Sequence, residues 1–374
     1  MRFVIMVPRG LKTGGPECLH QLHFTLLSLG HQSCLLAAPG SENSQPSPDY
    51  ESYLPRYISA GELVRSDILV VPEYLKSIPK SMERKVGRVV LWWLSVDYSP
   101  HFKGNMNSTK VAAVTDKWIP QEIGGSIEPH KVFRLESLRK VTIRKLIRYF
   151  YSKVLSRIDE FNSVDLPRNN SISAYQSEYA RRNVLERFGV EGLILTDYVK
   201  DIDFRENGGD SERFDNRPLI SFNGNKGFEL VQQLQRQLQD KVDFLLLKSF
   251  TRSELLEIFL KSDLYLDLGH FPGKDRMPRE ALKAGCPILI SRFGAAENEI
   301  DFAIPAEYKL DLENLDAESA AAKVLEILSL GRQSNLSSQE NYRKFLFQDK
   351  EKFIREVEQF ITFCEASLKS PILE

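Results

Sequence analysis

The chain has 374 residues, of which 42% are hydrophobic and 27% are charged, and its formal net charge at pH 7 is -1. This length predicts two domains, and the composition excludes a disordered or fibrous protein. The balanced charge gives no general attraction to nucleic acid, so we expect no nucleic-acid partner.

The cysteines and the hydrophobic runs of the sequence indicate the cellular compartment of the protein. The four cysteines are scattered and form no C-x-x-C pair, which disfavours a zinc site or disulfide framework and favours a reducing cytoplasm. Residues 1–10 lack the pattern of a signal peptide, and no run approaches the roughly 18 apolar residues of a membrane span. We therefore expect a cytoplasmic protein, with any membrane contact peripheral and on the inner face of the cytoplasmic membrane.

Short apolar runs alternate with helical patterns through the first hundred residues. Strands are predicted over 3–7, 33–37, 67–71 and 89–96, with a helix over 16–29. Strands that are apolar throughout are typical of parallel sheets buried on both faces. The pattern predicts a first doubly wound, Rossmann-like domain over residues 1–168.

The same alternation returns in the second half. Strands are predicted over 219–222, 243–247, 264–268 and 287–291, and helices over 228–238, 252–261 and 278–284. We assign residues 169–335 to a second Rossmann-like domain, because turn-forming residues cluster at 167–171, and residues 336–374 to a helical tail that packs across both. The predicted fold class is α/β, with two parallel sheets facing one cleft.

A basic amphipathic segment occupies residues 131–157, with nine Lys or Arg and one acid, Glu136. It has two interpretations. It either contacts an anionic membrane surface or the diphosphate of a lipid-linked acceptor, or it is a solvated helical face packed on its own protein.

Three loops contain residues suited to phosphate binding. The first holds Gly14 and Gly15 before the first predicted helix, where helix amides can bind an anion, although a simple tight turn is an equal alternative. The second holds Asn223, Lys226 and Gly227 after a strand, and it too is either a turn or a diphosphate loop.

The third loop, residues 270–287, is the most specific. Lys274, Arg276 and Arg279 stand beside a helix start and suit a diphosphate, while Glu280 suits ribose hydroxyls. The alternative is a charged loop whose Glu280 only favours the helix dipole.

The run Gly273-Lys-Asp-Arg-Met-Pro-Arg-Glu-Ala281 resembles the donor loop of GT-B glycosyltransferases, particularly the bacterial surface-polysaccharide (O-antigen or capsule type) enzymes related to family 4. Residues 13–17, 92–97 and 223–227 resemble other landmarks of that family. The resemblance implies a nucleotide-sugar donor bound by the C-terminal domain, with Glu280 on the ribose and Lys226 and Arg276 on the pyrophosphate. One departure is Pro272, where many retaining relatives carry a second Glu, and it leaves retention or inversion open.

The first candidate for the catalytic base is Asp97, at the end of a buried strand, and the alternative base is His101. Asp97 has an equally weighted structural interpretation as the cap of the following turn. Asp267 and Asp275 are lesser candidates. We expect no cofactor and no metal, because basic side chains and helix ends can stabilise a leaving diphosphate.

The predicted function is transfer of a sugar from a nucleotide-sugar to a saccharide or lipid-linked acceptor during cell-surface polysaccharide synthesis. The alternative is a non-catalytic nucleotide-sugar-binding protein or a scaffold of a polysaccharide assembly complex. The absence of the first Glu, at Pro272, leaves that alternative open.

Overall fold

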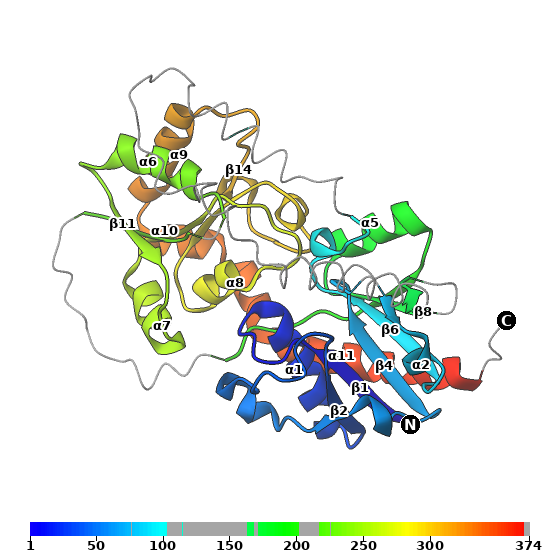
Figure 1. Ribbon diagram of the computed structural model, residues 1–374. Helices are drawn as coiled ribbons and strands as arrows, with labels where there is room; N and C mark the ends of the chain where they lie inside the picture. The colour runs from blue at the N-terminus through cyan, green and yellow to red at the C-terminus, as the bar shows by residue number, and fades with distance from the viewer. Residues whose placement is uncertain are drawn as a thin grey trace, which may run out of the picture.

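In the computed structural model, the residues described are 1–75, 77–102, 114, 163–167, 171–201, 217–224 and 226–369. The basic segment predicted over 131–157 lies outside these residues. Figure 1 shows two α/β units with one long C-terminal helix passing along both. Among the helices that the structure describes, none is long and apolar enough to cross a membrane.

The first unit is built on a seven-stranded sheet in the order β3-β2-β1-β4-β6-β8-β9, with every neighbouring pair parallel. The strands are β1 Arg2–Val7, β2 Gln32–Ala37, β3 Tyr57–Ile58, β4 Asp67–Pro72, β6 Arg88–Trp93, β8 Ser171–Tyr175 and β9 Gly192–Ile194. The order reverses between β1 and β4, so the sheet is doubly wound.

Both faces of this sheet are buried, as its continuously apolar strands require. Phe3 and Ile5 of β1 pack into a core shared with helix α1 (Gly14–Ser28), whereas Val4 and Met6 pack on the opposite face with helix α5 (Glu178–Phe188). The smaller elements are helix α2 Lys80–Glu83, the antiparallel pair β5 Ser77–Pro79 and β7 Ser163–Asp165, and 3₁₀ turns at Pro48–Tyr53, Ala60–Glu62 and Val96–Tyr98.

The second unit is built on a five-stranded parallel sheet in the order β11-β10-β12-β13-β14. The strands are β10 Leu219–Asn223, β11 Asp243–Leu247, β12 Leu264–Asp267, β13 Ile288–Ser291 and β14 Lys309–Leu310. The helices are α6 Phe228–Leu238, α7 Arg252–Lys261, α8 Arg276–Lys283, α9 Ala317–Ser329 and α10 Arg332–Ser338. Here the order reverses between β10 and β12.

Helix α11 (Glu340–Lys369), orange to red in Figure 1, belongs to both cores. Its first turns place Tyr342 and Leu346 in the core of the second unit. Its later turns place Phe353, Val357 and Phe360 in the core of the first unit, beneath the sheet. The helix therefore spans the junction by burying apolar side chains at both ends.

The first sheet extends beyond residue 168, where the sequence analysis placed the domain boundary. Strands β8 and β9 pair with β6 and with each other, and α5 connects them. The turn-forming residues at 167–171 separate two elements of one unit, and composition alone cannot distinguish such a turn from a linker. The chain enters the second sheet only at β10.

Candidate functional site

A cavity of about 560 Å³ lies between the two units. Its walls are formed by segments that follow β1, β4 and β6 of the first sheet and β10 and β12 of the second. Each sheet reverses its strand order between two of these strands, β1 and β4 in the first sheet and β10 and β12 in the second. Open α/β sheets bind ligands at such reversal points, beyond the carboxyl ends of their strands, so two ligand-binding edges face one space.

The Gly-Gly loop forms part of the first unit's wall. Helix α1 begins at Gly14 after Thr13, and Gly14 and Gly15 both line the cavity. A Cβ atom on Gly14 would stand 3.1 Å from Cδ of Arg276, so glycine lets the helix start approach that arginine closely. The first backbone N–H groups of α1 have no partner within the helix, and the helix dipole gives this end of α1 a partial positive charge at the cavity wall.

The loop after β10 forms the opposite wall. Asn223 and Lys226 line the cavity, and Gly227 adopts a left-handed conformation with φ 61° at the start of α6. A Cβ atom on Gly227 would lie 2.6 Å from the carbonyl oxygen of Leu268, which a larger residue cannot accommodate. Lys226 forms an ion pair with Asp275. Burial alone lowers the pKa of Lys226, but the nearby carboxylates of Asp275 and Asp267 raise it overall, so the ammonium group stays charged.

Arg276, the first residue of α8, reaches the cavity from the second unit. Its guanidinium nitrogens lie 3.5 Å from Glu17, 3.7 Å from Asp197 and 3.6 Å from Glu280, too far for hydrogen bonds. Both terminal nitrogens are buried and have no hydrogen-bond partner within the described part of the chain. Arg276 is thus a charged donor with unused hydrogen-bonding capacity at the wall of the cavity.

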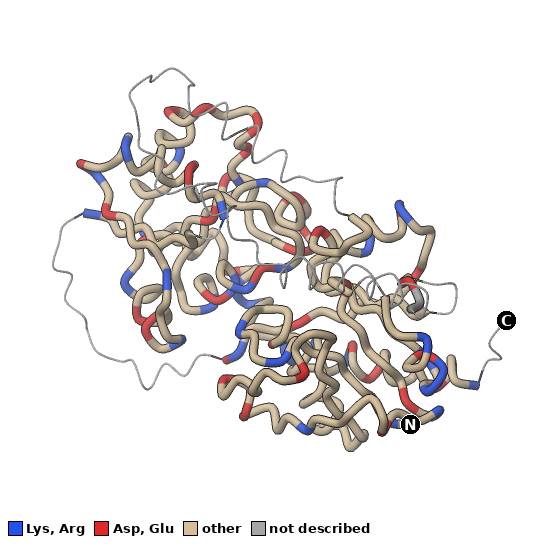
Figure 2. Tube along the Cα trace, in the orientation of Figure 1, with Lys and Arg blue, Asp and Glu red and all other residues tan. Residues whose placement is uncertain are grey.

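Glu280 stands one helical turn after Arg276 and pairs with it. Its side chain is not part of the cavity wall as the two units now sit, and about a fifth of it is exposed. The structure therefore brings Arg276, Glu280 and Glu17 together, with charged residues of both signs where the units meet (Figure 2).

Lys274 and Arg279, which the sequence analysis assigned to the donor, are buried and do not line the cavity. Arg279 is fully buried and donates to both carboxylate oxygens of Asp197 at 2.9 and 2.7 Å and to the carbonyl of Lys274 at 2.7 Å. Burial raises the pKa of Asp197, but Arg279 and Arg276 outweigh it and lower that pKa to about 2. The Lys274 ammonium is buried near the ring of Phe345 on α11, at 5.8 Å. Both residues fix the loop against the first unit and α11.

Asp97 and His101 also lie behind the cavity wall and do not line it. Asp97 accepts hydrogen bonds from the Tyr179 hydroxyl at 3.1 and 3.2 Å and is hydrogen-bonded to His270 of the second unit. His101 packs edge-on against Phe188, with ring centroids 5.8 Å apart. Their neighbours Ser95 and Tyr98 reach the cavity in their place.

Two buried carboxylates line the cavity. Asp267, a lesser candidate from the sequence, ends β12, and burial raises its pKa to about 6 although Lys226 lowers it. Glu73 follows β4 and was missed by the sequence analysis, although an acid directly after an apolar strand was a usable signal. Its two oxygens accept the backbone N–H groups of Leu94 and Ser95 at 3.0 and 2.9 Å. Burial raises the pKa of Glu73 to about 7 against the effect of these amides.

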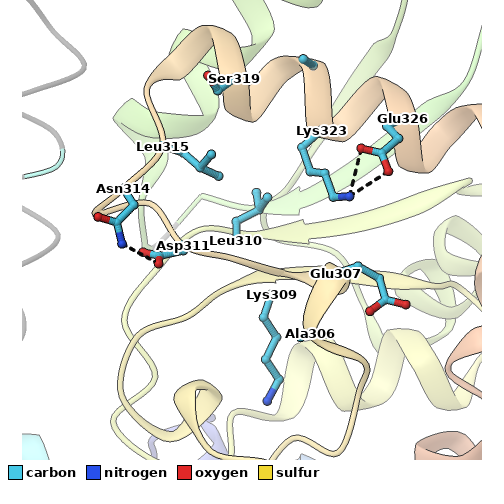
Figure 3. A pocket seen from close by; sticks show the side chains of 11 residues that line it. Ala306, Glu307, Lys309, Leu310, Asp311, Asn314, Leu315, Ser319, Lys323 and Glu326 are labelled. Carbon is cyan, nitrogen blue, oxygen red and sulfur yellow. Dashed lines mark hydrogen bonds and ion pairs between the residues drawn. The ribbon is translucent and has the colours of Figure 1, made fainter.

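A second cavity, of about 510 Å³, lies between β14 and α9, away from the junction (Figure 3). Its polar side chains are largely paired with one another: Lys323 binds Glu326, and Asn314 donates to Asp311. We therefore take the cavity between the units as the candidate site.

Comparison with known proteins rests on structure, because no family model and no curated protein sequence matches the chain. A glycosyltransferase from Rickettsia africae superposes with a TM-score of 0.56 at 11% identity, covering 99% of each chain. The sucrose-phosphate synthase of Thermosynechococcus elongatus gives 0.55 at 10%, covering 98% of this chain and 100% of that one. The N-terminal domain of Candida albicans trehalose-6-phosphate phosphatase gives 0.55 at 11%, covering 98% and 96%.

The chain has the GT-B fold. The superpositions extend over both units, and the two doubly wound parallel sheets meet at one cavity. This confirms the fold class predicted from the sequence. The GT-B architecture indicates where a ligand binds. Because one fold supports many reactions, the chemistry of the site depends on the side chains around the cavity.

Proposed function

We propose that the protein is a glycosyltransferase that moves a sugar from a nucleotide-sugar to a saccharide or lipid-linked acceptor. The observation that carries the proposal is Arg276, whose two terminal nitrogens are buried without hydrogen-bond partners in the described chain, at a cavity formed by both units. A planar guanidinium in this state can donate two parallel N–H groups to the oxygens of a negatively charged diphosphate.

The diphosphate of the donor lies between the start of α1, Arg276 and Lys226. The amides of Gly14 and Gly15 approach it from the first unit, and the loop from Asn223 to Gly227 approaches it from the second. Such fixed positive groups stabilise the charge that develops on a departing nucleoside diphosphate. The resemblance of the donor loop assigns the ribose to Glu280, which adjoins Arg276.

Lys274 and Arg279 have no part in this proposal, because both are engaged inside the protein. Independence from metal remains a prediction. It is supported by the charge that Arg276, Lys226 and the α1 start supply together.

The acceptor occupies the side of the cavity formed by the first unit. Tyr74 and Tyr98 line this side and expose 37% and 58% of their surfaces, which gives the acceptor amphipathic rings to contact. The proposal includes a lipid-linked acceptor for a surface polysaccharide and a position on the inner face of the cytoplasmic membrane. Both are supported by the basic composition of residues 131–157, which suits an anionic lipid surface or a diphosphate.

Titration calorimetry with UDP, GDP, dTDP, CMP and ADP, with and without magnesium, tests the donor site. We expect one nucleotide to bind without metal and to bind at least tenfold more weakly to Glu280→Ala. The matched control is Glu326→Ala, at the distant second cavity, which should bind like the wild type. Binding of no nucleotide would contradict the proposal. Tight binding without turnover of any nucleotide-sugar would favour a non-catalytic binding protein.

A further inference from the structure

Glu73 stands at the strand reversal of the first sheet and lines the cavity from the first unit, whereas Arg276 and Lys226, two of the groups assigned to the diphosphate, belong to the second unit. It follows β4, whose neighbour β1 leads into the Gly-Gly loop. Arg276 and Lys226 of the second unit line the same cavity. A carboxylate thus lines the acceptor side of the same space that holds the proposed leaving-group site.

The backbone holds this carboxylate in place. Each of its oxygens accepts one amide hydrogen, from Leu94 and from Ser95, both directly after β6. A carboxylate oxygen can accept a further hydrogen bond, so the group is oriented and still able to receive a proton. The residue is only 4% exposed, so bulk water solvates its charge poorly.

Asp97 lacks this arrangement. Its carboxylate is hydrogen-bonded to Tyr179 and His270 and does not line the cavity. Glu73 is the carboxylate that the first unit contributes to the lining of this cavity. The other ionisable side chains of the lining are Tyr74 and Tyr98 from the first unit and Lys226, Asp267, Asp275 and Arg276 from the second. Asp275 is paired with Lys226, and Asp267 lies within that charge group.

We propose that Glu73 is the catalytic base that accepts the proton of the acceptor hydroxyl. The inference rests on the proposed function and names the base of that same site. As the acceptor oxygen forms its bond to the anomeric carbon of the donor sugar, its proton passes to the Glu73 carboxylate. The bond between that carbon and the diphosphate oxygen breaks, and the electron pair leaves with the nucleoside diphosphate beside Arg276 and Lys226.

The protonation behaviour of Glu73 suits this task. Burial raises its pKa to about 7, and the amides of Leu94 and Ser95 limit the rise. A base with a pKa near the working pH combines a substantial ionised fraction with adequate proton affinity.

Glu73→Gln removes the proton acceptor: its amide oxygen keeps one of the two backbone hydrogen bonds, its NH2 group cannot replace the other, and neither atom can take up the acceptor proton. We would measure release of nucleoside diphosphate and of glycoside product between pH 5.5 and 9. The probes are UDP-glucose, UDP-galactose, UDP-N-acetylglucosamine and GDP-mannose as donors, with n-octyl β-D-glucopyranoside and n-octyl β-D-galactopyranoside as acceptors.

We expect wild-type kcat to rise with pH through an apparent pKa near 7. Glu73→Gln should lower kcat by about 10²- to 10⁴-fold and abolish that rise, with nucleotide affinity within twofold of the wild type. The matched control is Asp67→Asn at the other end of β4. Asp67 is a buried carboxylate that pairs with Arg2 and accepts the Val64 amide, so this variant should lose stability and keep the pH profile.

Each alternative outcome has a distinct meaning. A Glu73→Gln enzyme with wild-type kcat and pH profile would overturn the assignment of the base and leave the proposed function standing. Loss of nucleotide affinity in that variant would also overturn it, in favour of a structural role. A wild-type protein that binds no nucleotide and releases no product would remove the proposed function and this inference together.

Discussion

Asp97, just beyond β6, is hydrogen-bonded to His270, which follows β12, so the two residues join the first unit to the second. The Tyr179 hydroxyl of α5 donates to the same carboxylate at 3.1 Å. Only about 5% of the Asp97 side chain and 15% of the His270 side chain are exposed. The pair therefore acts as a contact between the units, next to the cavity and outside its wall.

Double-mutant analysis tests this contact. We expect Asp97→Ala and His270→Ala each to lower the rate of sugar transfer, because each releases one side of the junction. The double variant should be about as slow as either single variant, since both changes remove one shared interaction. Effects of the two single variants that add fully would contradict the pairing.

Arg276 and Arg279, three residues apart on α8, should respond differently to substitution. Arg276→Lys keeps the charge but loses the planar fork, so nucleoside diphosphate should bind about tenfold more weakly, a loss of about 1.4 kcal/mol, with little change in stability. Arg279→Met should lower the free energy of unfolding by about 3 kcal/mol, because it leaves Asp197 in the interior without its main partner. Calorimetry and urea unfolding of both variants measure the contrast, and equal effects on nucleotide binding would contradict it.

Gly273 makes a close approach between the units. A Cβ atom there would collide with the carbonyl oxygen of Leu94 and would lie 2.9 Å from Oε1 of Gln176, both in the first unit. Gly273→Ala should therefore hold the units apart, increase the radius of gyration in X-ray scattering and slow transfer at least tenfold. Gly61→Ala is the control, because its nearest neighbour, Oγ of Ser59, stands 3.5 Å away at an ordinary contact distance. An unchanged scattering curve for Gly273→Ala would count against a closed junction in solution.

The elevated pKa of Glu73 also predicts how stability depends on pH. Burial raises this pKa to about 7, so between roughly pH 4.5 and 7 the folded protein holds a proton that the unfolded chain releases. The free energy of unfolding therefore falls as pH rises through this window. Glu73→Gln removes that contribution, and its stability relative to wild type should increase by about 2–3 kcal/mol from pH 5 to pH 8. Asp267 shifts in the same direction in both proteins, so the difference isolates Glu73.

Local sequence patterns predicted most of the second unit. Helices α6 and α7 and strand β11 begin and end where their amphipathic or apolar runs do. Strand β8, by contrast, has the sequence Ser-Ile-Ser-Ala-Tyr, and its burial depends on pairing with β6, about 80 residues earlier. Such long-range pairing leaves no local signal, and for that reason the first unit was predicted to end too early.

The sequence indicated the loops that meet at the candidate cavity but not which of their side chains line it. The sequence places five charged residues in the loop and helix start over 274–280, but the rotation of α8 decides which of the helical ones stand near the cavity and which are buried. Arg276 and Glu280 share one side of the helix, while Arg279 and Lys283 are buried on another. Had the helix been predicted to begin at 276 instead of 278, the spacing of four residues within each pair would have placed Arg276 with Glu280 on one face and Arg279 with Lys283 on another. Glu73 had a local signal, an acid directly after an apolar strand, but its place at the cavity depends on the strand order.

Helix α11 has a consequence for how the chain is made. The core beneath the first sheet includes Phe353, Val357, Phe360 and Cys364, which are synthesised more than 150 residues after β9 closes that sheet. During translation this apolar face of the first sheet is covered only in part, by α1, until α11 has emerged from the ribosome. We therefore expect nascent chains that stop before residue 350 to be retained by chaperones, although every strand of both sheets has already been synthesised.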